Sequence, residues 1–212
     1  MRIAILGAGN VGGGLAGAAA KAGHDVIVSA STPASAQETA AKAGATAARS
    51  NAEAVNGADV VFLAVPGSLV ADVTRELADA LDGKVVVDAT NPLNAAYTDL
   101  TTSGTSSAEL LQAQLPGARV VKALNTVFAA RYANPSENGR PLDALIASND
   151  DDAKATVAEL VESIGFHALD AGSLRMARTL EEMAFLNISL NAGNGWSWQS
   201  AFTLVGPTSA AA

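Results

Sequence analysis

The chain has 212 residues, and its composition, with 49% hydrophobic and only 16% charged side chains, indicates a substantial buried core rather than a disordered chain. The net charge of −8, without any run rich in lysine and arginine, argues against a nucleic-acid partner, whose phosphates a binding protein must neutralise. The absence of cysteine excludes disulfide bonds, a thiolate nucleophile and a cysteine-ligated metal.

The first half of the chain alternates short apolar runs with helical segments, and glycine or proline marks most of the boundaries. The apolar runs do not alternate polar with apolar residues, which is typical of parallel strands covered by helices on both faces. The expected strands are residues 3–6, 25–29, 45–48, 59–65 and 84–88, and the expected helices are residues 11–22, 34–43, 52–55 and 68–81.

The second half begins with a polar stretch, residues 93–107, whose content of threonine, serine and asparagine predicts a loop. The acidic residues at the start of a helix expected at 151–164 suit the positive end of its dipole. Further strands are expected at residues 119–123, 143–146 and 166–169, and further helices at residues 108–114 and 179–190.

The most informative segment is Gly7-Ala8-Gly9-Asn10-Val11-Gly12, which follows the first expected strand and opens the first expected helix. A GxGxxG pattern in this context is typical of proteins that hold the pyrophosphate of a dinucleotide at a helix N-terminus. Gly7 permits the tight turn, Gly9 lets the backbone approach the pyrophosphate, and Gly12 lets helix and strand pack closely. A glycine-rich turn in an unrelated α/β protein is the alternative.

The order of elements and the glycine loop together predict an α/β fold with a Rossmann-type, doubly wound and mostly parallel sheet and a small C-terminal α/β part. We expect residues 1–124 to form the dinucleotide-binding domain. Residues 125–212 should extend the sheet and end in a dimerisation helix, because the apolar residues of the last helix recur at spacings of three and four and need a partner surface.

The residues after the second strand bear on the choice between NAD and NADP. Proteins that bind NAD typically place a carboxylate there, whereas this chain has hydroxyl side chains at Ser29, Ser31 and Thr32. Because no carboxylate is present to repel a 2′-phosphate, these residues favour NADP. Arg49, after the weak third strand, either supplies the positive charge that usually accompanies a 2′-phosphate or is a solvated loop residue.

The whole chain, to about Phe202, resembles the NADPH-dependent reductases of the deazaflavin coenzyme F420. Beyond the glycine loop, the resemblance rests on the segments Phe62–Pro66, Val120–Asn134 and Leu169–Leu174, the last of them followed by a terminal helix and by Asn191–Gly195. In that family the deazaflavin stacks on the nicotinamide of NADPH, and the terminal helices help to form a homodimer.

The resemblance also implies which residues hold the two ligands. Those implied for the NADP site are Asn10, Val11, Ser31, Val65 and Pro66. Those implied for the border of the deazaflavin are Asn125, Thr126, Val127 and Phe128, together with the segment at 193–195 that includes Gly195. Asn91, which follows the strand at 84–88, is counted with these cofactor-binding residues.

The chain departs from the family's usual pattern at two places. Members usually have Gly-Ser-Arg or Asn-Ser-Arg where this chain has Ser29-Ala30-Ser31, and the best-known members have histidine where this chain has Asn125. The pair Lys122 and Asn125 is similar instead to the reductase domain of the six-transmembrane ferric reductases, which use FAD. The second substrate is therefore expected to be coenzyme F420 or a flavin.

Hydride transfer between two stacked rings requires no nucleophile and no metal, so we assign no catalytic residue and expect no metal site. Lys122 either faces the cofactor as a catalytic acid or caps the end of its strand. We expect His24 and His167 to be structural, and Asn149–Asp152 to cap a helix rather than to bind a cation.

Trp196 and Trp198 lie close in sequence to the segment implied for the ring site. Their aromatic faces either stack on a flavin-like ring or pack in a dimer interface.

The sequence thus predicts an NADP-dependent oxidoreductase that transfers a hydride between NADP(H) and a deazaflavin or flavin. A protein that only senses NADP(H) is one alternative, and a reductase of another small substrate is a second, although about 90 residues after Leu124 leave little room for the helical domain of carbonyl and imine reductases. No apolar stretch reaches the roughly 18 residues of a membrane helix, and residues 1–6 are too short for a signal peptide. We therefore expect a cytoplasmic protein with no membrane partner, and the family resemblance implies that it is a homodimer.

Overall fold

The computed structural model describes residues 1–206, so the last six residues of the expected C-terminal part lie outside it. Eight strands form the main sheet in the order β10-β9-β6-β5-β4-β1-β2-β3. Their bounds are β1 Arg2–Leu6, β2 Asp25–Ser29, β3 Thr46–Ala47, β4 Val60–Leu63, β5 Val85–Asp88, β6 Arg119–Ala123, β9 Asp143–Ser148 and β10 His167–Gly172.

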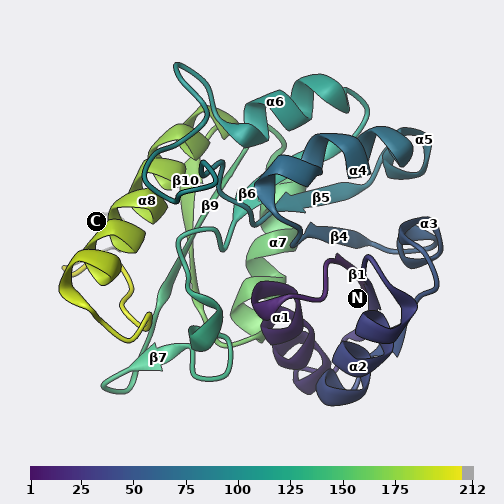
Figure 1. The fold of residues 1–212 in the computed structure, drawn as a ribbon, viewed down its shortest axis with the longest axis horizontal. Helices are drawn as coiled ribbons and strands as arrows, with labels where there is room; N and C mark the ends of the chain where they lie inside the picture. The colour runs from purple at the N-terminus through teal and green to yellow at the C-terminus, as the bar shows by residue number, and fades with distance from the viewer. Residues whose placement is uncertain (207–212) are drawn as a thin grey trace, which may run out of the picture.

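Six of these strands, β1 to β6, run parallel in the order that defines a doubly wound dinucleotide-binding sheet (Figure 1). The chain leaves β1 toward β2 on one side and later returns to place β4 on the other side. The carboxyl ends of β1 and β4 therefore flank the point where the strand order reverses, which is where ligands of such sheets bind. The predicted fold class is confirmed.

Helices cover both faces of the sheet because alternate residues of each strand point to opposite sides and both sets are apolar. In β1, for example, Ile3 and Ile5 belong to one buried cluster and Ala4 and Leu6 to the other. The helices are α1 Asn10–Lys21, α2 Pro33–Ala43, α3 Asn51–Val55, α4 Val70–Glu76, α5 Ala78–Leu81, α6 Ser107–Gln114, α7 Asp151–Ser163 and α8 Ala177–Asn194.

Different helices form the two layers that cover the sheet. Helices α1 and α7 pack with the first strand face, whereas α3, α4, α5 and α6 pack with the second, and Figure 1 shows α4, α5 and α6 grouped on one side of the sheet. Helix α8 lies at the far end from α2, where it contacts α6. No helix within residues 1–206 has both the length and the apolar character needed to span a membrane.

Two strands of the C-terminal part extend the main sheet. β9 pairs antiparallel with β6, and β10 then pairs parallel with β9. The buried residues of α7, among them Val157 and Leu160, share one cluster with residues of β1 and α1.

Three local features differ from the sequence expectation. The helix expected at 68–81 is divided into a 3-10 turn at Gly67–Leu69, α4 and α5, with the break at Leu77. The last helix is longer than residues 179–190, since α8 ends only where Gly195 adopts a left-handed conformation. A small hairpin, β7 (Ser136–Glu137) with β8 (Arg140–Pro141), was not expected, because runs of two residues carry no periodic signal.

Candidate functional site

The glycine loop joins β1 to α1, and the backbone geometry explains two of its glycines. Gly7 has φ of +122°, and a Cβ there would overlap the carbonyl oxygen of Ala64 at the end of β4. A Cβ on Gly12 would overlap the carbonyl oxygen of Gly7. Both positions therefore require glycine because the start of α1 packs directly against the loop and β4.

Gly9 is different, because nothing lies within 4 Å of the position a Cβ would take. It is the N-cap of α1, and its φ of −77° is open to any residue. No side chain caps this helix, so the N–H groups of its first turn are available to a ligand. Open space in front of an uncapped helix N-terminus is the arrangement that binds a phosphate or pyrophosphate.

The three hydroxyl residues at the end of β2 and directly after it lie in different environments. Ser29 is buried, and its hydroxyl donates to Oδ1 of Asn51 at 2.7 Å. The Thr32 hydroxyl accepts from the Ser35 backbone N–H and caps α2. Ser31 is exposed and makes none of the side-chain hydrogen bonds found within residues 1–206, so among the three its hydroxyl is the one most open to a ligand.

Arg49 lies beside this region because β3 pairs with β2 and the Ala48 N–H donates to the carbonyl of Val28. Its guanidinium binds the carboxylate of Glu53, with Nε 3.2 Å from Oε2, and the side chain is 89% exposed. Of the two interpretations of Arg49, the solvated loop residue describes this arrangement.

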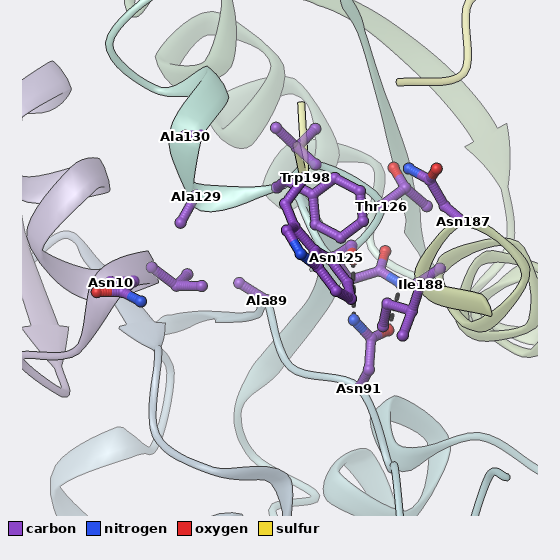
Figure 2. A pocket seen from close by; sticks show the side chains of 14 residues that line it. Asn10, Ala89, Asn91, Asn125, Thr126, Ala129, Ala130, Asn187, Ile188 and Trp198 are labelled. Atoms are coloured by element: carbon purple, nitrogen blue, oxygen red, sulfur yellow. Dashed lines mark hydrogen bonds between the residues drawn. The ribbon is translucent and has the colours of Figure 1, made fainter. Parts of the chain in front are cut away.

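A cavity of about 720 Å³ opens at the carboxyl ends of the strands, beyond the start of α1. Figure 2 shows Asn10 on the α1 side of it and Asn187 and Ile188 of α8 on the opposite side. The lining residues are Asn10, Val11, Ala89, Asn91, Asn125, Thr126, Val127, Phe128, Ala129, Ala130, Ala184, Asn187, Ile188 and Trp198.

A second cavity of about 350 Å³ adjoins the first, and the two share Val11, Ala89 and Asn91. Val65 and Pro66, which follow β4, line this smaller cavity. The glycine loop therefore lies beside two adjoining cavities at the point where the strand order reverses.

The structure brings most of the residues implied by the sequence to this one place. The larger cavity has Asn10, Val11, Asn91 and all of residues 125–128 in its wall, and the smaller one has Val65 and Pro66. Gly195 lines neither cavity. Its φ of +63° and its place as the C-cap of α8 give a separate reason for glycine there.

Asn91 and Asn125 connect the ends of β5 and β6 across the floor of the larger cavity. Asn91 Nδ2 donates to the Asn125 carbonyl at 2.9 Å, and Asn125 Nδ2 donates to Asn91 Oδ1 at 2.9 Å and to the Leu180 carbonyl at 3.0 Å. These bonds fix the orientation of both amides, since carbonyl oxygens accept only from the nitrogen end. They also tie the floor of the cavity to α8.

Sequence reasoning missed the contribution of α8 to the cavity wall. Ala184, Asn187 and Ile188 line it and lie three and four positions apart, so they share one face of the helix. The same spacing was interpreted as a surface for a partner. The face that lines the cavity is distinguished by Asn187, a buried polar residue.

Lys122 neither faces the cavity nor caps the end of its strand, so both sequence interpretations were wrong. It is fully buried, and Nζ lies 2.9 Å from Asp88 Oδ2, 2.8 Å from Glu181 Oε1 and 2.7 Å from the Thr90 carbonyl. Burial alone would raise the pKa of Asp88, but the Lys122 ammonium and hydrogen bonds from Thr90 outweigh it and hold that pKa below its usual range. This cluster joins β5, β6 and α8.

The two histidines and the acidic run stand apart from both cavities. His24 lies 2.8 Å from the Ser163 hydroxyl, and His167 pairs with Asp143 at 2.8 Å. Asp150 accepts from the Ala153 N–H and is the N-cap of α7, as the sequence predicted.

The doubly wound sheet, the uncapped helix behind a glycine loop and the cavities at the switch point define a dinucleotide-binding protein of the Rossmann class. Residues 2–92 match the family described as NADP oxidoreductase, coenzyme F420-dependent. Over 213 aligned residues the chain is 34% identical to the F420-dependent NADP reductase of Methanothermobacter marburgensis, with 92% of this chain and 94% of that protein covered. The chain therefore belongs to the family of F420-dependent NADP reductases, as its sequence motifs indicated.

One further comparison agrees with this placement, and a second shows similarity to part of a protein with a different description. A solved structure from Arthrobacter sp. FB24, whose own assignment as an F420-dependent NADP reductase is provisional, has a TM-score of 0.87 and 31% identity and covers 97% of this chain and all of that one. The rat metalloreductase STEAP3 is 34% identical over 182 residues, which is 85% of this chain but only 36% of that protein.

Proposed function

We propose that this protein is an NADP-dependent oxidoreductase that transfers a hydride between NADP(H) and a planar deazaflavin or flavin, with coenzyme F420 the first candidate. The observation that carries the proposal is the 720 Å³ cavity directly beside the glycine loop. A dinucleotide whose pyrophosphate lies on the first turn of α1 would extend its nicotinamide toward Asn91 and Asn125. The cavity leaves space there for a second ring, and its volume lies within the usual range for small-molecule sites.

NADPH supplies a hydride, which is two electrons and one proton, and the acceptor ring takes it up together with a second proton from solvent. The chain's own residues have three tasks in this scheme. The N–H groups behind Gly9 bind the pyrophosphate. The Asn91–Asn125 pair fixes the cavity floor, and Val11, Val127 and Ile188 exclude water from the place where the rings meet.

Names of family members support NADP rather than NAD as the dinucleotide. Exposed Ser31 and the absence of a carboxylate after β2 agree with it. We propose that Ser31 and Thr32 border the 2′-phosphate, while the hydroxyl of Ser29 supports the loop through Asn51.

The decisive experiment follows NADPH oxidation by the purified protein with coenzyme F420, FMN or FAD, and with a small imine and a small carbonyl compound. We expect rapid oxidation with F420 or a flavin and none with the small substrates. A protein that binds NADPH tightly but oxidises it with none of these acceptors would instead be a sensor. Oxidation only with the imine or carbonyl would establish a reductase of another small substrate.

We further propose a cytoplasmic homodimer that binds no nucleic acid, with residues 1–124 holding the dinucleotide and the remainder of the chain completing the acceptor site. Leu186 and Leu190 on α8 are 51% and 37% exposed, which supports a partner surface on that helix. Analytical ultracentrifugation should give a dimer for the unmodified protein and a monomer for Leu186→Glu. A monomer in both cases would refute the dimer.

A further inference from the structure

Trp198 is the residue of the C-terminal segment that reaches the larger cavity, and its backbone is held in an unusual conformation. Its φ is +59°, in the left-handed region that bulky side chains rarely adopt. Trp198 lines the cavity, whereas Trp196, two residues earlier, does not. Strained backbone conformations cluster at binding and catalytic sites, so the conformation of Trp198 at the cavity wall suggests that its side chain has a role in binding.

A network of buried side chains holds this conformation in place. The Trp198 N–H donates to Asn191 Oδ1 at 3.1 Å, and Asn191 Nδ2 donates to the Ser200 hydroxyl at 2.6 Å. The same hydroxyl donates to Asn187 Oδ1 at 2.6 Å. Asn187 and Asn191 are 4% and 0% exposed, so the helix side of this network is buried. The segment after α8 is therefore fastened to the helix on both sides of Trp198.

The orientation of the indole is fixed as well. Its ring centroid lies 5.5 Å from that of Phe128, and the two ring planes meet at 84°, which is an edge-to-face contact. Phe128 also lines the cavity. Figure 2 shows the indole among the lining side chains, near Asn125 and Asn91 and across the cavity from Asn10. Trp198 is 45% exposed, so part of its surface remains open to a ligand or to solvent.

We infer that Trp198 is the outer wall of the hydride-acceptor site and selects a flat, conjugated, multi-ring acceptor over small aliphatic carbonyl or imine compounds. The inference rests on the proposed function, because the acceptor is the second substrate of that reaction. An indole held rigidly beside Phe128 offers a large aromatic surface at little cost in conformational entropy. A small aliphatic substrate would leave most of that surface without contact.

The test compares Trp198→Ala, Trp198→Phe and the matched control Trp196→Ala, which changes the same residue type at nearly the same exposure, 48% against 45%. Equilibrium binding of coenzyme F420 and of FMN to the NADP-loaded protein is followed by the fluorescence of the ring, and NADPH binding is measured separately by calorimetry. We expect Trp198→Ala to weaken ring binding about tenfold, Trp198→Phe at most about threefold, and Trp196→Ala less than twofold. NADPH affinity should change less than twofold in all three.

Trp198→Gly is a second variant that removes the indole with less risk of unfolding, because glycine adopts the left-handed conformation without strain. This variant should fold and should bind the ring as weakly as Trp198→Ala does. The inference is overturned if Trp198→Gly or Trp198→Ala binds the ring as tightly as the unmodified protein, if Trp196→Ala weakens it equally, or if NADPH affinity falls as much as ring affinity. An unmodified protein that binds the ring through Trp198 but transfers no hydride would refute the proposed function and leave this inference standing.

Discussion

Replacement of Gly9 by alanine tests the phosphate loop without disturbing the fold. The added methyl group would meet nothing within 4 Å, and the φ of −77° suits alanine. The cost in stability is the weaker N-cap preference of alanine, partly offset by a less flexible unfolded chain, so we expect the free energy of unfolding to change by less than about 1 kcal/mol.

The effect on dinucleotide affinity should be much larger. The methyl group would point into the space where the pyrophosphate must approach the backbone, and it would prevent at least one charge-assisted hydrogen bond. Such a bond contributes about 1.5–3 kcal/mol, which corresponds to roughly 10- to 150-fold in the dissociation constant. Isothermal titration calorimetry with NADPH measures this change directly.

Two other glycines of α1 are matched controls. Gly17→Ala also adds a methyl group with nothing within 4 Å, but two turns farther along the helix, and should leave NADPH affinity unchanged. Gly12→Ala would overlap the Gly7 carbonyl and should impair folding itself. If Gly9→Ala binds NADPH within threefold of the unmodified protein, the pyrophosphate does not lie on this loop.

Three further changes test other parts of the structure. Ser31→Asp places a carboxylate where we propose the 2′-phosphate, so the ratio of NADPH to NADH affinity should fall; an unchanged ratio by calorimetry would place the phosphate elsewhere. Lys122→Met leaves two buried carboxylates unpaired and should lower the free energy of unfolding in urea by about 3–5 kcal/mol, so an unchanged midpoint would contradict the cluster. Hydrogen bonds from Arg178 lower the pKa of Glu109 from 4.5 to about 2. A carboxylate with a lowered pKa stabilises the fold above pH 4.5 and loses that effect as the pH falls toward 2. Because this ion pair is partly exposed to solvent, Glu109→Gln should lower the free energy of unfolding at neutral pH by no more than about 1 kcal/mol and flatten the stability profile between pH 4.5 and 2; equal acid sensitivity of both proteins would refute the assignment.

Local sequence signals predicted the parts of the fold that have clear boundaries. The bounds of β2 and β6 agree with the expected strands at 25–29 and 119–123, and each strand begins two residues after a glycine, Gly23 or Gly117. The break at Leu77 had no such signal, because leucine continues a helical pattern. The antiparallel pairing of β9 with β6 depends on tertiary structure, and the sequence of the strand alone does not determine its direction.

Site residues could be predicted where a short sequence motif identifies them. They could not be predicted where their role depends on residues that are distant in sequence. The glycine loop could be recognised from one hexapeptide, because its three glycines lie at fixed spacings between a strand and a helix, although the contact of Gly7 with Ala64 became visible only in the folded chain. Lys122 could not, because its partners Asp88 and Glu181 lie 34 and 59 residues away in sequence. The resemblance implied Gly195 for the border of the deazaflavin, although its positive φ at the end of α8 gives another reason for glycine there. Trp198 was identified as a candidate, but its strained backbone became visible only in the folded chain.

The most direct test of the central claim uses NADPH that carries deuterium at the reactive carbon of the nicotinamide, in separate samples for each of its two faces. The protein is mixed with coenzyme F420, FMN or FAD, and the reduced acceptor is analysed by mass spectrometry and NMR. If the two rings meet in the cavity beside the glycine loop, deuterium from one face alone should pass directly to the acceptor without exchange with water. Reduced acceptor that contains only solvent hydrogen at its reactive carbon in the F420 sample, or no reduced acceptor with any of the three, would contradict direct hydride transfer at this site.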